Sequence, residues 1–130
     1  MLMEKEEKSI SRNAVLSTLE ELLSSNDAVY GALLSSIDGH PFASKARDEM
    51  AESKLSAMTS SCLALSEKIA VEAKQNGCDF VIIQNTNGYL VIKRVGKKLV
   101  LTALADQSIN LGMLLSAAKC AAEALYRKIT

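Results

Sequence analysis

Apolar residues follow two different spacings along the chain, and the change between them divides the sequence into elements. From Ser11 onward, apolar residues recur at intervals of three and four, which is the spacing of one face of an α-helix. Residues 27–37 alternate loosely instead, and Asp38 and Gly39 then supply turn residues before the short run PFASKA. The pattern therefore predicts a helix followed by a β-hairpin. The apolar face of the helix consists of Val15, Leu16, Leu19, Leu22 and Leu23.

A second, longer helix is predicted from Glu49 to about Gln75, and its two sides differ in character. One side is a continuous apolar stripe that we expect to face the core. The opposite side carries small residues where a solvated helix would carry charges. The expected core stripe is Ala51, Leu55, Met58, Cys62, Leu65, Ile69 and Ala73. The small-residue side is Ser53, Ala57, Ser60, Ala64 and Val71.

The small-residue side is interpreted as a contact with another protein. Ala57, Ala64 and Val71 lie seven residues apart, which keeps a seam facing another helix, and small side chains let helix backbones approach closely. Glu67 and Lys68 would belong to the polar rim of such a contact. Two simpler explanations stay open. Alanine and serine are also tolerated on a solvated helix, and another part of the same chain could cover this side.

The stretch DFVIIQNTNGYLVIKRVGKKLVLTALAD, residues 79–106, predicts a meander of three antiparallel strands. Asn87 and Gly88 are expected to supply the positive φ angles of a tight hairpin, and Gly96 and Lys97 form the second turn. Without a following helix N-terminus or a GxxxxGK[ST] pattern, Gly96 is a turn residue and not part of a phosphate loop. The expected strands cover residues 80–83, 89–95 and 98–105.

The last helix is predicted to begin after Ser108, a residue type that commonly caps helix N-termini. Gly77 is expected in the left-handed position that follows the end of the preceding helix. Arg127 and Lys128 near the chain end complement the negative pole of the last helix dipole without any ligand. The apolar face is formed by Leu111, Leu114, Leu115, Ala118, Ala121, Ala122, Leu125 and Ile129.

Composition argues against several classes of function. The 15 basic and 15 acidic residues cancel, so the chain has no electrostatic footprint for nucleic acid. No run reaches the length of a membrane span, and the N-terminus lacks the apolar region of a signal peptide, so we expect no membrane insertion and a cytoplasmic location. Residues 1–10 are predicted to be a flexible N-terminus and residues 11–130 a single domain.

The candidate chemical groups do not form a catalytic or metal-binding pattern. Cys62, Cys78 and Cys120 match no zinc-ligand spacing, and the single histidine, His40, is expected on a solvated turn beside Pro41. We therefore expect no catalytic residue, no metal and no cofactor. The cysteines are interpreted as small hydrophobic residues of a reduced protein. Cys78 follows Gly77 at a predicted helix-to-strand junction, where we expect more exposure than in the middle of a helix.

The succession of helix, two strands, helix, three strands and helix resembles the Roadblock family, which includes the dynein light-chain type domains. The resemblance rests on the turn IDGHPFAS, the long helix ending in NGCDFVII, and the run GYLVIKRVGKKLVLTALADQSINLGMLL. It implies an α+β fold of the profilin and longin type, with the order α-β-β-α-β-β-β-α. The five strands would form an antiparallel sheet in the order 2-1-5-4-3, with helices on both faces.

The resemblance also implies a function and partners. Family members pair into homodimers or heterodimers through their second helices and third strands, so we expect self-association or pairing with a Roadblock paralogue. The third strand, residues 79–84, would then be an edge strand whose unpaired backbone groups are covered. The expected interface consists of Ser53, Ala57, Ser60, Ala64, Lys68, Val71, Phe80, Val81 and Ile82.

The family's usual work is to regulate or scaffold a small Ras-like GTPase, or to act as a dynein light chain. We therefore expect a non-enzyme that binds such a GTPase and modulates its nucleotide state or location in polarity or motility. Arg47, Arg94 and Arg127 show no pattern of an arginine finger, so any stimulation of GTP hydrolysis would come from positioning the GTPase's own residues.

Two alternatives from other classes remain. A sensory domain of profilin or PAS-like topology would bind a small ligand between its sheet and a helix. A small hydrolase would use Ser60, Ser61 or Cys62, but a serine cluster in mid-helix lacks the strained turn that presents a nucleophile.

Overall fold

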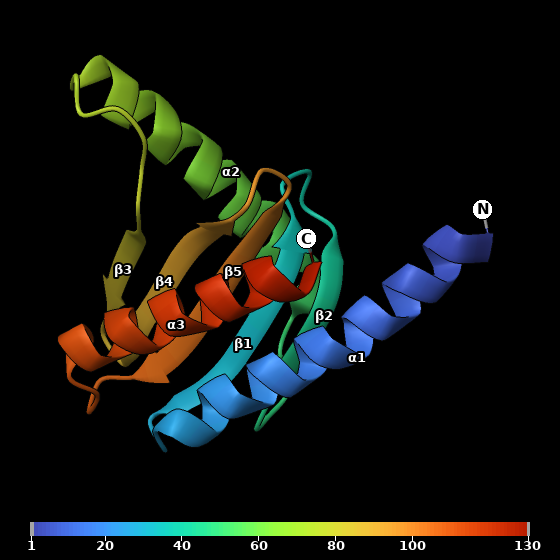
Figure 1. Ribbon diagram of the computed structural model, residues 1–130. Coiled ribbons are helices and arrows are strands. Elements are labelled where there is room, and N and C mark those ends of the chain that lie inside the picture. Colours follow the sequence, from blue (N-terminus) through green and yellow to red (C-terminus); the bar gives the residue numbers. More distant parts are fainter. Residues whose placement is uncertain (1, 130) are drawn as a thin grey trace.

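The computed structural model describes residues 2–129, with side chains from Arg12 onward, and these residues form one five-stranded sheet covered by helices (Figure 1). The strands are antiparallel and lie in the order β2-β1-β5-β4-β3, which confirms the predicted topology. The elements are α1 Leu2–Ser25, β1 Val29–Ser36, β2 Pro41–Ala46, α2 Glu52–Glu72, β3 Val81–Asn85, β4 Gly88–Val95, β5 Leu99–Asp106 and α3 Leu111–Ile129.

Helices α1 and α3 lie side by side on one face of the sheet, and α2 lies on the other (Figure 1). The face under α1 and α3 holds the main hydrophobic core. The side chains of Leu19, Leu114 and Leu125 are fully enclosed there, as the helical periodicity of both helices predicts. Lys128 reinforces the helix pair, because its Nζ donates a hydrogen bond to Thr18 Oγ1 at 2.6 Å.

The face under α2 holds a much smaller apolar cluster, built from Leu63 of α2, Ile92 of β4 and Val100 of β5. Three hydroxyl groups are buried in this region without a hydrogen-bond partner among the described residues: those of Ser35, Ser56 and Thr102. Figure 1 shows that the C-terminal end of α2 stands clear of the sheet. The two faces therefore hold their helices in different ways.

Several local features differ in detail from the sequence-based expectations. Helix α3 begins after Asn110, whose Oδ1 accepts a hydrogen bond from Met113 N at 3.2 Å. Ser108 instead belongs to the preceding turn, where its N–H and hydroxyl both donate to Asp106. These hydrogen bonds lower the pKa of the Asp106 carboxyl, because they favour its charged form.

The end of α2 also differs from the prediction. The residue in the left-handed region after the helix is Lys74, with φ of 59°, and not Gly77. The N–H of Lys74 donates to the carbonyl of Val71, and the N–H of Gln75 donates to the carbonyl of Ala70. This is the Schellman arrangement, which satisfies two of the last carbonyls of a helix.

Gly88 is needed for close packing and not for a positive φ angle, which neither it nor Asn87 has. A Cβ atom at this position would overlap the carbonyl oxygen of Ala105 in the neighbouring strand.

At the start of the chain, α1 begins at Leu2, nine residues before the predicted start at Ser11. Residues 2–10 belong to this helix, and the flexible N-terminus over residues 1–10 stays a prediction.

Candidate partner-binding surface

Helix α2 turns a different side toward the sheet than its periodicity predicts. Most of the stripe that is predicted to face the core points away from the sheet: Met58, Leu65 and Ile69 are 67%, 60% and 58% exposed. Leu55 and Cys62 of this stripe are half-buried, and Cys62 packs against the small apolar cluster under α2. The residues that α2 buries against the sheet are mostly small or polar. They are Ser56, Thr59, Ser60, Leu63 and Ala70.

Close approach of the backbones explains this reversal at the N-terminal half of α2. A Cβ atom on Gly39, in the β1–β2 turn, would lie 3.1 Å from Ala57 Cα and 3.0 Å from Ser60 Oγ. Only small side chains fit where a helix lies this near to a turn. The hydroxyls of Thr59 and Ser60 bond to carbonyls of their own helix, at 2.7 Å and 3.0 Å, so these two can be buried at low cost.

This orientation buries some residues of the expected interface within the chain's own fold and leaves others on the surface. Ser60 is buried within its own chain, beside Gly39 of the β1–β2 turn. Phe80 and Val81 are half-buried and pack against the chain's own apolar clusters. Ile82 is 42% exposed. The remaining expected residues, all exposed or partly exposed, are Ser53, Ala57, Ala64, Lys68 and Val71.

Strand β3 lies beside this helix at the edge of the sheet and adds a second unpartnered feature. It pairs with β4 from Val81 to Asn85, and no strand of the described chain pairs with its outer side. Ile82 and Ile83 are exposed on it, at 42% and 36%. An exposed apolar edge strand is prone to pair with another chain unless something covers it. The outward face of α2 and the strand β3 together form what we call the α2–β3 surface, defined by Met58, Leu65, Ile69, Val71 and Ile83. Ile82 points to the opposite face of the sheet, because it pairs with Val91 of the main core, whereas Ile83 shares the α2 face with Val81.

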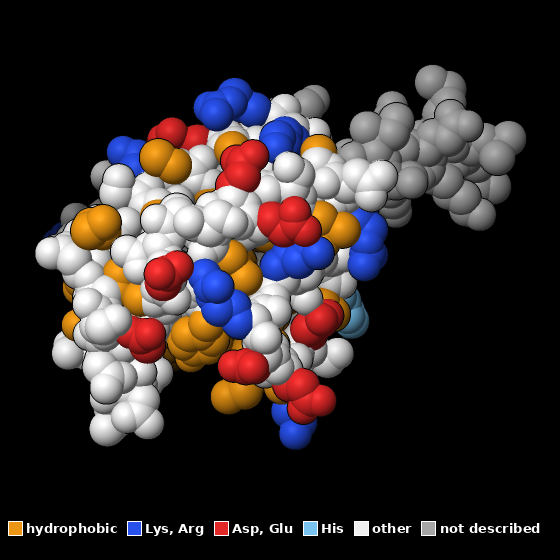
Figure 2. Space-filling model, turned by 90° about the horizontal axis from the view of Figure 1, so that it is seen from below, with side chains coloured by type: hydrophobic (Ala, Val, Ile, Leu, Met, Phe, Trp, Pro, Cys, Tyr) orange, Lys and Arg blue, Asp and Glu red, His pale blue; other side chains and the backbone are white. Residues whose placement is uncertain are grey.

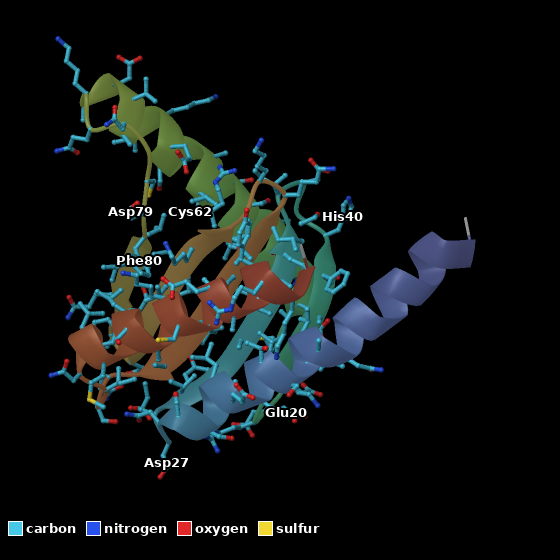
Figure 3. The ribbon with its side chains drawn as sticks, in the orientation of Figure 1. Glu20, Asp27, His40, Cys62, Asp79 and Phe80 are labelled. Atoms are coloured by element: carbon cyan, nitrogen blue, oxygen red, sulfur yellow. The ribbon has the colours of Figure 1, made fainter. Side chains whose placement is uncertain are left out.

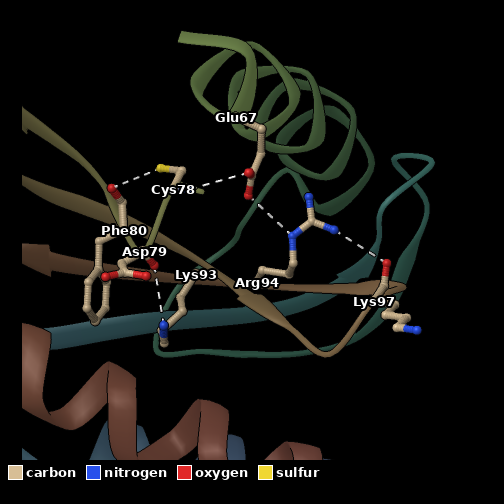
Figure 4. Close-up of polar contacts among 7 residues, drawn as sticks. All are labelled: Glu67, Cys78, Asp79, Phe80, Lys93, Arg94 and Lys97. Atoms are coloured by element: carbon tan, nitrogen blue, oxygen red, sulfur yellow. Dashed lines mark hydrogen bonds and ion pairs between the residues drawn. The ribbon is translucent and has the colours of Figure 1, made fainter. Parts of the chain in front are cut away.

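Figure 4 shows a group of polar contacts beneath the distal half of α2. One carboxylate oxygen of Glu67 lies 3.4 Å from Arg94 Nε, and the other accepts a hydrogen bond from Cys78 N at 3.3 Å. Lys93 Nζ donates to the carbonyl of Asp79 at 3.3 Å and lies 4.6 Å from the centre of the Phe80 ring. These contacts join α2, the α2–β3 loop and β4.

Nothing in the described part of the chain has the character of a reactive centre. The pKa of the Cys78 thiol is raised, first by burial and then by the nearby Glu67 and Asp79 carboxylates, so the thiolate is disfavoured. His40 is exposed on its turn, where its backbone N–H donates to Ser36 Oγ (Figure 3). The described residues include no group of three potential metal ligands, and none of their helices has the length and apolar character to span a membrane.

Charge does not define a second surface on the face that Figure 2 displays. Acidic and basic side chains are interspersed there, with apolar side chains between them, and neither sign forms a continuous patch. The functional interpretation therefore starts from the apolar α2–β3 surface.

The sheet order and the placement of the helices define an α+β domain of profilin-like topology. Profilin II of Acanthamoeba castellanii is similar, with a TM-score of 0.59 and 16% identity over 85% of this chain and 94% of that chain. Residues 15–105 match the Roadblock/LC7 domain. Because this match covers more than half of the sequence, the chain belongs to the Roadblock/LC7 domain family.

Solved structures of MglB proteins are more similar than profilin. The gliding protein MglB of Thermus thermophilus has a TM-score of 0.83 and 22% identity, covering 92% of this chain and 90% of that chain. An MglB structure with a tetrameric arrangement has a TM-score of 0.84 and 24% identity, with the same coverage. At these identities the likeness concerns the fold. No curated protein sequence matches the chain.

Proposed function

We propose that this protein is a non-catalytic regulator that self-associates through the α2–β3 surface and binds a small Ras-like GTPase in the cytoplasm. The observation that carries the proposal is the outward apolar face of α2 beside an unpaired sheet edge. Met58, Leu65 and Ile69 are each more than half exposed, which a helix that served only its own core would not require.

The likeness to MglB supports self-association in particular, since one of the similar structures has a tetrameric arrangement. In a two-fold assembly each copy would contribute the same surface, so one exposed helix and one exposed edge would cover their symmetry mates. Such pairing would remove both the exposed apolar side chains and the unpaired edge of β3 from water. A Roadblock paralogue with a similar surface could take the place of the second copy.

Binding of a GTPase is proposed from membership of the Roadblock/LC7 domain family. Arg47, one of the three arginines considered as a finger, is engaged within the fold: its Nε donates to Val29 O and its guanidinium nitrogen to Leu23 O. Arg94 is paired with Glu67. In this proposal the regulator acts by holding the GTPase's own catalytic residues or by fixing its location.

A substitution on each side of the molecule tests the self-association. We expect Leu65→Asp to convert the assembly to monomers, because a carboxylate would be buried without a partner in the interface. Met113→Asp is the matched control, since Met113 is exposed by 57% but lies on α3, across the sheet. Light scattering over a concentration series measures both. A wild-type protein that is monomeric at high micromolar concentration would refute the self-association.

The GTPase partnership is tested separately. Small Ras-like GTPases from the same genome, loaded with GDP or with a non-hydrolysable GTP analogue, are each mixed with the protein, and binding is measured by titration calorimetry. We expect a preference for one nucleotide state, because a regulator must bind the two states differently to shift their balance. Equal affinity for both states would leave only a scaffolding role, and no binding to either would refute the partnership.

The packing at the centre of the α2 face argues against the sensory alternative. The space between α2 and the sheet is filled at its centre by the packed side chains of Leu63, Ile92 and Val100. A ligand there would have to displace this cluster.

A further inference from the structure

The side of α2 that faces the sheet changes character along the helix. In its first half, small residues let the helix lie close to the β1–β2 turn, as described above. In its second half the row that faces the sheet runs from Leu63 through Glu67 to Ala70, at steps of four and three. A carboxylate therefore stands at the position where a packed helix would place an apolar residue.

Glu67 makes contacts to two separate elements, and both of its oxygens are used. Oε1 pairs with Arg94 of β4 at 3.4 Å, and Oε2 accepts the N–H of Cys78 in the α2–β3 loop at 3.3 Å (Figure 4). The side chains of Glu67 and Arg94 are only 27% and 32% exposed. Arg94 is itself held, because its guanidinium donates to the carbonyl of Lys97 at 3.5 Å in the β4–β5 turn.

The distal half of α2 has little else to fix it. Ala70 is its one buried apolar residue after Leu63, and Leu65, Ile69 and Val71 point into solvent. The segment that follows, residues 73–77, is exposed throughout. The orientation of the distal half relative to β3 therefore depends on the Glu67 carboxylate and on the loop that it holds.

We propose that Glu67 is a positioning residue for partner binding: its carboxylate fixes the distal half of α2 so that Leu65, Ile69 and β3 form one continuous surface. This inference rests on the proposed self-association and names the group that prepares the surface for it. If the carboxylate is removed, the helix end moves independently of β3. Ordering it on binding then reduces the net free energy of association.

Two substitutions at Glu67 separate its two contacts. Glu67→Gln keeps an oxygen for the N–H of Cys78 and removes the charge that pairs with Arg94, whereas Glu67→Ala removes both. We expect Glu67→Gln to weaken self-association by about three- to tenfold and Glu67→Ala to weaken it further, as measured by analytical ultracentrifugation. Arg94→Gln should match Glu67→Gln, and the Glu67→Gln, Arg94→Gln double variant should lose little more than either single variant.

Glu20→Gln is the matched control, because Glu20 forms an ion pair with Lys45 at 2.9 Å that lies away from α2 and β3. It should leave self-association unchanged. Amide hydrogen exchange at a dilution that favours monomers reports the local effect, and we expect faster exchange in residues 66–75 of the Glu67 variants only.

Each outcome decides the proposal. Faster exchange together with weaker association supports it. Faster exchange with unchanged association would show that Glu67 only stabilises the helix end, and unchanged exchange would show that it does not fix this end; either result overturns the positioning role. A wild-type chain that never self-associates would refute the proposed function first, and this result is distinct because it appears without any substitution.

Discussion

The two faces of the sheet hold their helices by different means. On one face, α1 and α3 bury large aliphatic side chains such as Leu19, Leu114 and Leu125 in an extended core. On the other, α2 buries mainly hydroxyl groups and alanine around a cluster of Leu63, Ile92 and Val100. Burial of a leucine side chain contributes about 1.5–3 kcal/mol, so the first face contributes far more to stability than the second.

This difference separates two roles that the sequence pattern does not distinguish. The face under α1 and α3 builds the fold, and it is complete within one chain. Helix α2 keeps most of its larger apolar residues on its outer side, where they are available to another molecule. A helix that is lightly attached on one side and apolar on the other is suited to a contact that a second chain completes.

The largest expected effect is a difference between two leucine truncations. Leu114 in the main core and Leu63 under α2 are both fully buried, at 0% and 1% exposed. We expect Leu114→Ala to lower the free energy of unfolding by about 4 kcal/mol and Leu63→Ala by about 2 kcal/mol, because α2 can settle onto its small neighbours and shrink the cavity. Equilibrium unfolding in urea, at one protein concentration for all variants, measures both.

If the two truncations lowered the free energy of unfolding equally, the difference between the two faces would be refuted. Val100→Ala, on the sheet side of the smaller cluster, is a useful companion, since its loss should also fall below that of Leu114→Ala. An equal or greater loss at either position would show that α2 is held as firmly as α1 and α3.

A smaller effect of opposite sign is expected at Thr102. Its hydroxyl is buried on the α2 side of β5 and has no hydrogen-bond partner among the described residues. Replacing such a group by an apolar one of the same shape removes the penalty of burying it. We expect Thr102→Val to raise the free energy of unfolding by up to about 1 kcal/mol, measured by the same urea titration.

Thr18→Val is the control for that substitution. Thr18 is also buried, but its hydroxyl accepts a hydrogen bond from Lys128 and donates one to the carbonyl of Ala14. The same change there should lower stability. A loss of stability in Thr102→Val would mean that its hydroxyl is satisfied, and the contrast between the two faces would be smaller than described.

The fold could be predicted from the sequence, whereas the orientation of α2 could not. The spacing of Val15, Leu19 and Leu22 has one interpretation, because the other side of α1 carries Glu20 and Glu21. In α2 both sides are uncharged over long stretches, so periodicity offers two candidate inner faces. The usual rule for a helix that packs only on its own chain assigns the larger apolar residues to the core.

Some of the candidate surface was nevertheless found from sequence. The prediction that β3 is an edge strand agrees with the structure. Met58, Leu65 and Ile69 were missed, because they were placed in the core. The one available signal was Gly39: a glycine in the turn beside a helix of serines and alanines is typical of close backbone approach, which would have placed Ser56 and Ser60 on the inside.

The smallest expected effect is at the end of α2, where the contrast between the faces can be sharpened without touching the core. Lys74 occupies the left-handed region at φ of 59°, which costs an L-residue about 1 kcal/mol and glycine nothing. Glycine also gains freedom in the unfolded chain, so we expect Lys74→Gly to raise the free energy of unfolding by only about 0.5 kcal/mol. Lys68→Gly, in the helix interior, should lower it by about 1 kcal/mol.

Because the helix end stands clear of the sheet, the gain in Lys74→Gly should appear mainly as slower amide hydrogen exchange in residues 70–75, with little change in the main core. Slower exchange that extended into α1 and α3 would mean that α2 and the main core unfold as a single cooperative unit.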